Sequence, residues 1–101
     1  MTRVLLTALT LASFTLVVPA YAAGDAAAGK AKAGSCAMCH GPNGEGTQMA
    51  PKLAGEDAAK FVQAMNDYKS GKRDNAMMKS AASSLSADDF ANLAAYYAAI
   101  K

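Results

Sequence analysis

The chain has 101 residues, of which 52% are hydrophobic and 18% are charged, and its formal net charge is +2. This length suits one domain, and a charge so close to neutral argues against a nucleic-acid-binding protein. Two cysteines and one histidine cannot fill the four positions of a closed structural zinc site.

The first 22 residues have the pattern of a secretory signal peptide. Arg3 supplies a positive start, residues 4–18 are uncharged and mostly apolar, and Ala20-Tyr21-Ala22 has the small residues of a cleavage site. The apolar run is shorter than the roughly 20 residues that a membrane-spanning helix needs. We expect cleavage after Ala22, with cleavage after Ala23 as the alternative.

Cleavage would leave residues 23–101 as the mature domain, exported to the periplasm. Removal of Arg3 from the ten Lys and Arg residues leaves nine against eight Asp and Glu, so the mature net charge is +1. This near-neutral domain has few large apolar residues. A domain below about 80 residues rarely builds a sufficient hydrophobic core without an additional stabilising element, such as a disulfide or a metal. The sequence therefore indicates a core that a bound cofactor completes.

The first predicted helix covers residues 26–33, after a cap at Gly24-Asp25. Gly29 interrupts it, and a glycine in mid-helix costs about 1 kcal/mol relative to alanine. We therefore expect Gly29 to allow a close crossing with another helix. Gly34-Ser35 is expected to end this helix.

The next stretch is Cys36-Ala37-Met38-Cys39-His40. Two cysteines separated by two residues and followed by histidine form the attachment pattern of a c-type haem. Each thiol can add across one haem vinyl group to form a thioether, and the imidazole of His40 then reaches one face of the iron. A disulfide or a thiol redox pair is the alternative, but either would leave His40 unexplained.

Residues 41–55 hold four glycines and two prolines, without periodicity, and predict a loop around the haem edge. Residues 57–69 predict a helix, because Phe61, Val62, Met65 and Tyr68 fall on one stripe and Gly71 can end it. Residues 72–84 are expected to be irregular.

The last helix is marked by Ser86 as its cap and Asp89 three residues later, which together form a capping box. Phe90, Leu93 and Tyr97 make its apolar face. With three main helices, connecting loops and no predicted strand, the expected fold is all-α.

The second axial ligand cannot be another histidine, because the chain has only one. Four methionines follow the motif. Met65 lies on the stripe of a helix and is expected in the core, and Met49 lies only nine residues beyond His40. Met77 and Met78 lie far enough from His40 in the sequence to reach the other face of the iron, and their spacing from His40 does not distinguish them.

The mature chain resembles the class I c-type cytochromes, especially short bacterial mono-haem cytochromes c and single halves of di-haem cytochromes c. The residues that carry the resemblance are Ala23 to Gly29, Cys36 to Gly41, Ala50 to Gly55, Gly71 to Arg73, Leu85-Ser86, and Leu93 to Tyr96.

This resemblance implies the cytochrome c fold around one haem c, held by thioethers from Cys36 and Cys39. It implies His40 and Met78 as the iron ligands, with Met77 as the alternative to Met78. It also implies that the Pro51 carbonyl accepts a hydrogen bond from His40, and that Gly29 meets the last helix near Tyr96.

Two protein ligands would leave no open site for substrate or oxygen, and no nucleophile–base pair lies near the motif. We therefore expect a soluble periplasmic carrier of one electron between redox partner proteins, not an enzyme, and a monomer. One alternative is a haem subunit of a larger oxidoreductase, for instance with a flavoprotein dehydrogenase. Another is a five-coordinate haem that binds gases or has peroxidase activity. Four lysines are candidates for a rim around the haem that steers an acidic partner, with an ordinary solvated surface as the alternative: Lys30, Lys32, Lys52 and Lys79.

Overall fold

The computed structural model describes residues 8, 10–15 and 24–101. Its helices are α1 (Ala26–Lys32), α2 (Gly34–His40), α3 (Ala58–Ser70), α4 (Ala76–Ser83) and α5 (Ala87–Ala98). The described residues contain no strand, which confirms the all-α prediction. Nor does any helix among them combine the length and apolarity that are needed to cross a bilayer.

The helix ends follow the predicted caps. Asp25 accepts hydrogen bonds from the Ala27 and Ala28 amides at the start of α1. Ser86 and Asp89 form the predicted capping box of α5, which satisfies backbone donors that the helix leaves unpaired. Gly71, with φ of 84°, ends α3 in the left-handed conformation that glycine adopts most readily.

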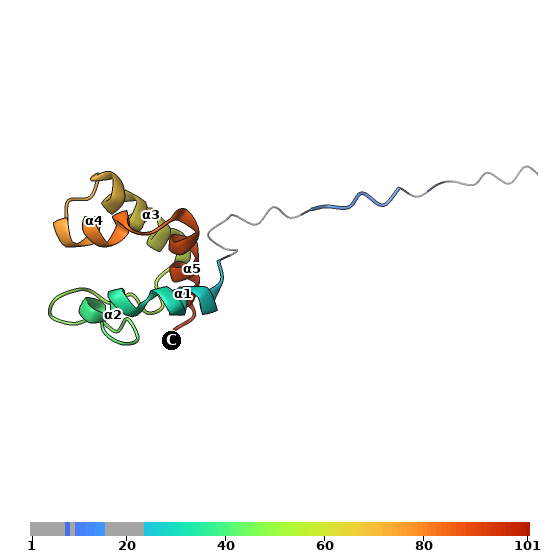
Figure 1. Ribbon diagram of the computed structural model, residues 1–101. Helices are drawn as coiled ribbons and strands as arrows, with labels where there is room; N and C mark the ends of the chain where they lie inside the picture. The colour runs from blue at the N-terminus through green and yellow to red at the C-terminus, as the bar shows by residue number, and fades with distance from the viewer. Residues whose placement is uncertain (1–7, 9, 16–23) are drawn as a thin grey trace, which may run out of the picture.

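Helix α5 forms the centre of the core. Its residues Phe90, Leu93 and Tyr97 are fully buried, and α3 adds Phe61 and Met65 to the same cluster. Helix α5 packs against both α1 and α3, and α3 packs against α4. Figure 1 shows the result: α1 and α2 lie on one side, α3 and α4 on the other, and α5 closes one end.

The predicted close crossing at Gly29 is confirmed. A Cβ atom on this residue would lie 2.0 Å from the Asn92 carbonyl oxygen and 2.9 Å from the Tyr96 Cβ atom. Both neighbours belong to α5, so the glycine lets the backbones of α1 and α5 approach directly.

Two local predictions were wrong. Residues 72–84 are not irregular throughout, because Ala76–Ser83 forms α4. The Asn75 side chain accepts a hydrogen bond from the Met78 amide and caps this helix, and alanine, methionine and lysine are strong helix formers. The cysteine motif does not follow a helix end but forms α2 itself, after a brief break at Ala33.

The predicted signal peptide lies mostly outside the described residues. Of residues 1–22, the structure describes residues 8 and 10–15, which form neither helix nor strand. The predicted start of the mature domain at residue 23 is also outside the described part, so the division of the chain at this point stays a prediction.

Candidate haem-binding site

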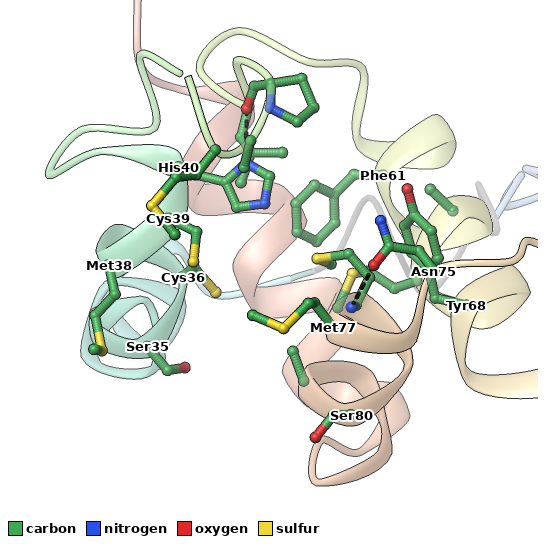
Figure 2. A pocket seen from close by; sticks show the side chains of 18 of the residues that line it. Ser35, Cys36, Met38, Cys39, His40, Phe61, Tyr68, Asn75, Met77 and Ser80 are labelled. Atoms are coloured by element: carbon green, nitrogen blue, oxygen red, sulfur yellow. Dashed lines mark hydrogen bonds between the residues drawn. The ribbon is translucent and has the colours of Figure 1, made fainter. Parts of the chain in front are cut away.

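A cavity of about 820 Å³ opens between the two sides of the fold. Helix α2 and the loop of residues 41–55 form one wall, and α3 and α4 form the other. In Figure 2, Cys36, Cys39 and His40 lie on one wall and Met77 and Asn75 on the other, with Phe61 between them. The cavity therefore has sulfur and nitrogen donors on opposing walls and an apolar floor.

Helix α2 places the two cysteines on one face of the molecule. Cys36 and Cys39 are three residues apart, a spacing that brings side chains together on one side of a helix. Both are free thiols, both are partly buried, and both line the cavity. Burial raises the pKa of the Cys36 thiol above its ordinary value, against the opposing effect of hydrogen bonds from Ser35 and Tyr97.

His40 is 5% exposed, and its two ring nitrogens have different environments. The Nδ1 atom lies 2.6 Å from the Pro51 carbonyl oxygen, which confirms the contact implied by the family resemblance. Because a carbonyl only accepts hydrogen bonds, Nδ1 carries the proton and Nε2 holds a lone pair. Nε2 is buried and, among the described residues, has no hydrogen-bond partner.

The loop that carries Pro51 is held by its own backbone. The Leu53 and Ala54 amides both donate to the Gly44 carbonyl, at 2.7 and 2.9 Å, and the Gly46 amide donates to the His40 carbonyl at 2.8 Å. These bonds fold the predicted loop back against α2, so the Pro51 acceptor is fixed beside the imidazole.

The opposing wall presents two neighbouring methionines at the start of α4. Met78 is half-buried and packs against the core, whereas Met77 is 70% exposed. Both line the cavity. Of the other two candidates, Met65 is 4% exposed, as expected for a core residue, and Met49 is 73% exposed at the cavity mouth.

Three polar residues at the cavity were not predicted as site residues. Glu56, Tyr68 and Arg73 all line it, and the Arg73 guanidinium lies over the Tyr68 ring at 4.9 Å. Burial raises the pKa of Glu56, partly offset by the positive charge of Arg73. The sequence placed Tyr68 on the apolar stripe of a helix and Arg73 in a segment of the family resemblance, but no characteristic spacing marked these three residues as members of a site.

The four lysines considered for steering do not gather around the cavity. Of these, only Lys52 is among the described residues that line it. Lys32 instead pairs with Asp89 across the α1–α5 contact, at 3.7 Å. The steering role of these four lysines stays a prediction.

The residues present fit a haem. A buried imidazole nitrogen with a free lone pair costs about 1–3 kcal/mol if it stays unpaired, and a metal ligand bond would satisfy it. Two thiols on the same wall can hold a porphyrin edge, and a thioether sulfur is available on the opposing wall. This is the donor set of a His/Met-ligated c-type haem.

Comparison with known proteins gives the same answer. The family model for cytochrome c matches residues 26–100. Cytochrome c4 of Pseudomonas aeruginosa is 46% identical over 83 residues, which are 81% of this chain and 41% of that protein. Cytochrome c-554(548) of Halomonas halodenitrificans is 42% identical over 79 residues, which are 74% of this chain and 95% of that protein.

A solved structure, the cytochrome c4 of Acidithiobacillus ferrooxidans, superposes with a TM-score of 0.72 at 27% identity. The match covers 74% of this chain and 49% of the solved one. The chain thus spans about two fifths to half of the cytochrome c4 proteins and nearly all of cytochrome c-554(548). The family match, the shared fold and the donor set agree: the chain belongs to the cytochrome c family, and its domain is one that binds haem c covalently.

Proposed function

We propose that this protein is a mono-haem carrier of single electrons between redox proteins. The observation that carries the proposal is the buried Nε2 lone pair of His40, aimed into a cavity whose walls also hold both cysteines. When bound, the haem supplies the one-electron exchange between Fe(III) and Fe(II).

The protein residues have separate roles in this proposal. Cys36 and Cys39 would hold the porphyrin edge through thioethers, so the cofactor could not dissociate. His40 would supply one ligand to the iron through Nε2, and the Pro51 carbonyl fixes the imidazole orientation and tautomer. Met78 would supply the second ligand, and methionine together with histidine raises the reduction potential.

The half-burial of Met78 supports its selection over Met77. A ligand sulfur must stay directed into the cavity, and contact with the core restrains the Met78 side chain. Met77 is mostly in solvent and would lose more conformational freedom on ligation. We assign Met77 to the cavity mouth.

The export pattern of residues 1–22 supports a periplasmic location, and the partners are redox proteins that dock at the cavity mouth. Contacts of this kind are usually small, below about 1,200 Å² in total, which permits rapid exchange. The protein would act as a soluble monomer, and size-exclusion chromatography with light scattering checks this state.

The deciding experiment uses the exported protein, purified from its periplasmic fraction. We expect its mass to exceed that of residues 23–101 by one haem, and its reduced spectrum to be unchanged by carbon monoxide. A bare chain would refute haem attachment. A carbon monoxide complex would instead indicate an open coordination site and favour gas binding or peroxidase chemistry. Elution with a larger flavoprotein would favour the subunit alternative.

A further inference from the structure

The Thr47 side chain joins the end of α2 to the loop that carries Pro51. Its hydroxyl donates a hydrogen bond to the Cys39 carbonyl oxygen, at 2.5 Å. This carbonyl lies in the last turn of α2, where backbone acceptors have no partner within the helix. The Thr47 hydroxyl oxygen also accepts a hydrogen bond from the Met49 amide, at 3.0 Å. One side chain therefore ties the cysteine motif to the middle of the loop.

The backbone on either side of this hydroxyl closes the same part of the loop. The Thr47 amide donates to the Ala50 carbonyl oxygen, at 2.8 Å. The preceding residue, Gly46, donates its amide to the His40 carbonyl oxygen, also at 2.8 Å. Gly46 lies directly against the other arm of the loop, because an added Cβ atom would be 3.3 Å from the Pro51 carbonyl carbon. This part of the loop thus contacts both α2 and the chain at Pro51.

Together these bonds form a closed ring around the imidazole. Thr47 is bonded to Cys39 through its hydroxyl and to Ala50 through its amide. Ala50 is followed by Pro51, whose carbonyl accepts the hydrogen bond from His40 at 2.6 Å, and His40 follows Cys39 in the chain. Proline has no N–H group of its own to anchor it. The direction of the Pro51 carbonyl therefore depends on its neighbours, and Thr47 holds the one before it.

We propose that Thr47 is a positioning residue for the haem ligand His40, an inference that rests on the proposed haem site. By holding the Pro51 carbonyl against Nδ1, it keeps the imidazole in the tautomer and orientation that leave Nε2 free for a metal. An imidazole that donates such a hydrogen bond is also a more basic ligand, and a more basic ligand favours ferric over ferrous iron. Thr47 therefore keeps the reduction potential below the value that a loosened loop would give.

The test compares Thr47→Val with Thr47→Ser in the haem-loaded protein. Valine keeps the branched shape but removes both hydrogen bonds of the hydroxyl, whereas serine can make them. Proton NMR of the reduced protein measures how fast the His40 Nδ1 proton exchanges with water. In Thr47→Val we expect this exchange to be about tenfold faster, because two hydrogen bonds that keep the loop closed are lost, and we expect a higher midpoint potential. Thr47→Ser should match the wild type in both measurements.

Ser83→Ala is the matched control. It also removes a hydroxyl that donates to a backbone carbonyl, that of Lys79, at 2.6 Å. This bond lies in α4, outside the loop, so its loss should leave the exchange rate and the potential at their wild-type values. Equal changes in Ser83→Ala and Thr47→Val would mean a general loosening of the fold and would overturn the inference.

Two further results would also contradict it. One is a wild-type exchange rate and potential in Thr47→Val, and the other is a Thr47→Ser variant that behaves like Thr47→Val, which would assign the effect to the methyl group. If valine gives no loaded protein, Thr47→Ala removes the same hydroxyl without a second methyl group. Loss of loaded protein in both would limit Thr47 to a role in folding and refute its role at His40. Absence of haem from the wild-type protein would refute the proposed function instead, so the two failures are distinguishable.

Discussion

His40 illustrates how one side-chain environment determines which chemistry a residue can perform. Its Nδ1–H group donates a hydrogen bond to the Pro51 carbonyl oxygen, at 2.6 Å. The lone pair of Nε2 is therefore available to bind a metal at the cavity wall. The motif predicted the imidazole as a ligand, and the resemblance implied its acceptor. The lack of a hydrogen-bond partner at Nε2 could be seen only in the structure, because it depends on which of the described residues lie beside the imidazole.

The choice of Met78 as second ligand leads to a prediction at this scale. Met78→Ala should abolish the weak near-infrared band that arises from methionine sulfur bound to ferric haem, and it should permit carbon monoxide binding after reduction. Loss of the sulfur opens a coordination position, which is the physical reason for both effects. Near-infrared absorption and a carbon monoxide difference spectrum measure them.

Met77→Ala is the matched control, since it removes a methionine from the adjacent position on the same helix. It should keep the band at full intensity. If the band survives in Met78→Ala and disappears in Met77→Ala, the two roles must be exchanged.

At the scale of elements, the sequence predicted the helices whose faces and caps are both clear. α3 and α5 each have a stripe of large apolar residues, a capping side chain and a defined start, and both formed as expected. α4 was missed because it has eight residues and little large apolar surface. Its stability depends on packing, as the complete burial of Ala82 indicates, and packing partners are not readable from a short segment.

The α1–α5 contact gives the prediction for this scale. Gly29→Ala should lower the free energy of unfolding by about 1–3 kcal/mol, because its new methyl group would overlap the Asn92 carbonyl, which is rigid backbone. Gly34→Ala is the control, since nothing lies within 4 Å of its added methyl group. It should be neutral or stabilise by up to about 1 kcal/mol.

Denaturant unfolding of the two haem-loaded variants measures the difference. Equal stability of Gly29→Ala and wild type would mean that α1 and α5 can separate at no cost, contrary to the packing described.

At the scale of the whole molecule, the apolar core is small. Its buried hydrophobic members, among the described residues, are Ala33, Phe61, Met65, Ala82, Phe90, Leu93, Ala94 and Tyr97. Three of these eight are alanines, which contribute little buried area each. Composition indicated this deficit in advance, but the size and position of the complementary cavity emerged only from the packing of α2, α3 and α4 around it.

We therefore predict that the chain without haem does not fold cooperatively. A version without residues 1–22, produced where no haem is attached, should give a broad thermal transition by circular dichroism and little protection from proteolysis. The loaded protein should melt sharply, because a bound cofactor stabilises only the folded state. A sharp, native-like transition of the apoprotein would show that the eight-residue core suffices.

The contact of α1 with α5 also bears on how such a unit combines with others. Gly24, the first described residue of the domain, lies against Ala91 of α5, and Ile100, just beyond the end of α5, lies against Gly55. Both ends of the described domain are thus held against α5 and the loop of residues 41–55. A second unit joined at either end would therefore attach to a fixed point of the first, which bears on proteins as long as the cytochrome c4 chains, of which this chain spans about half.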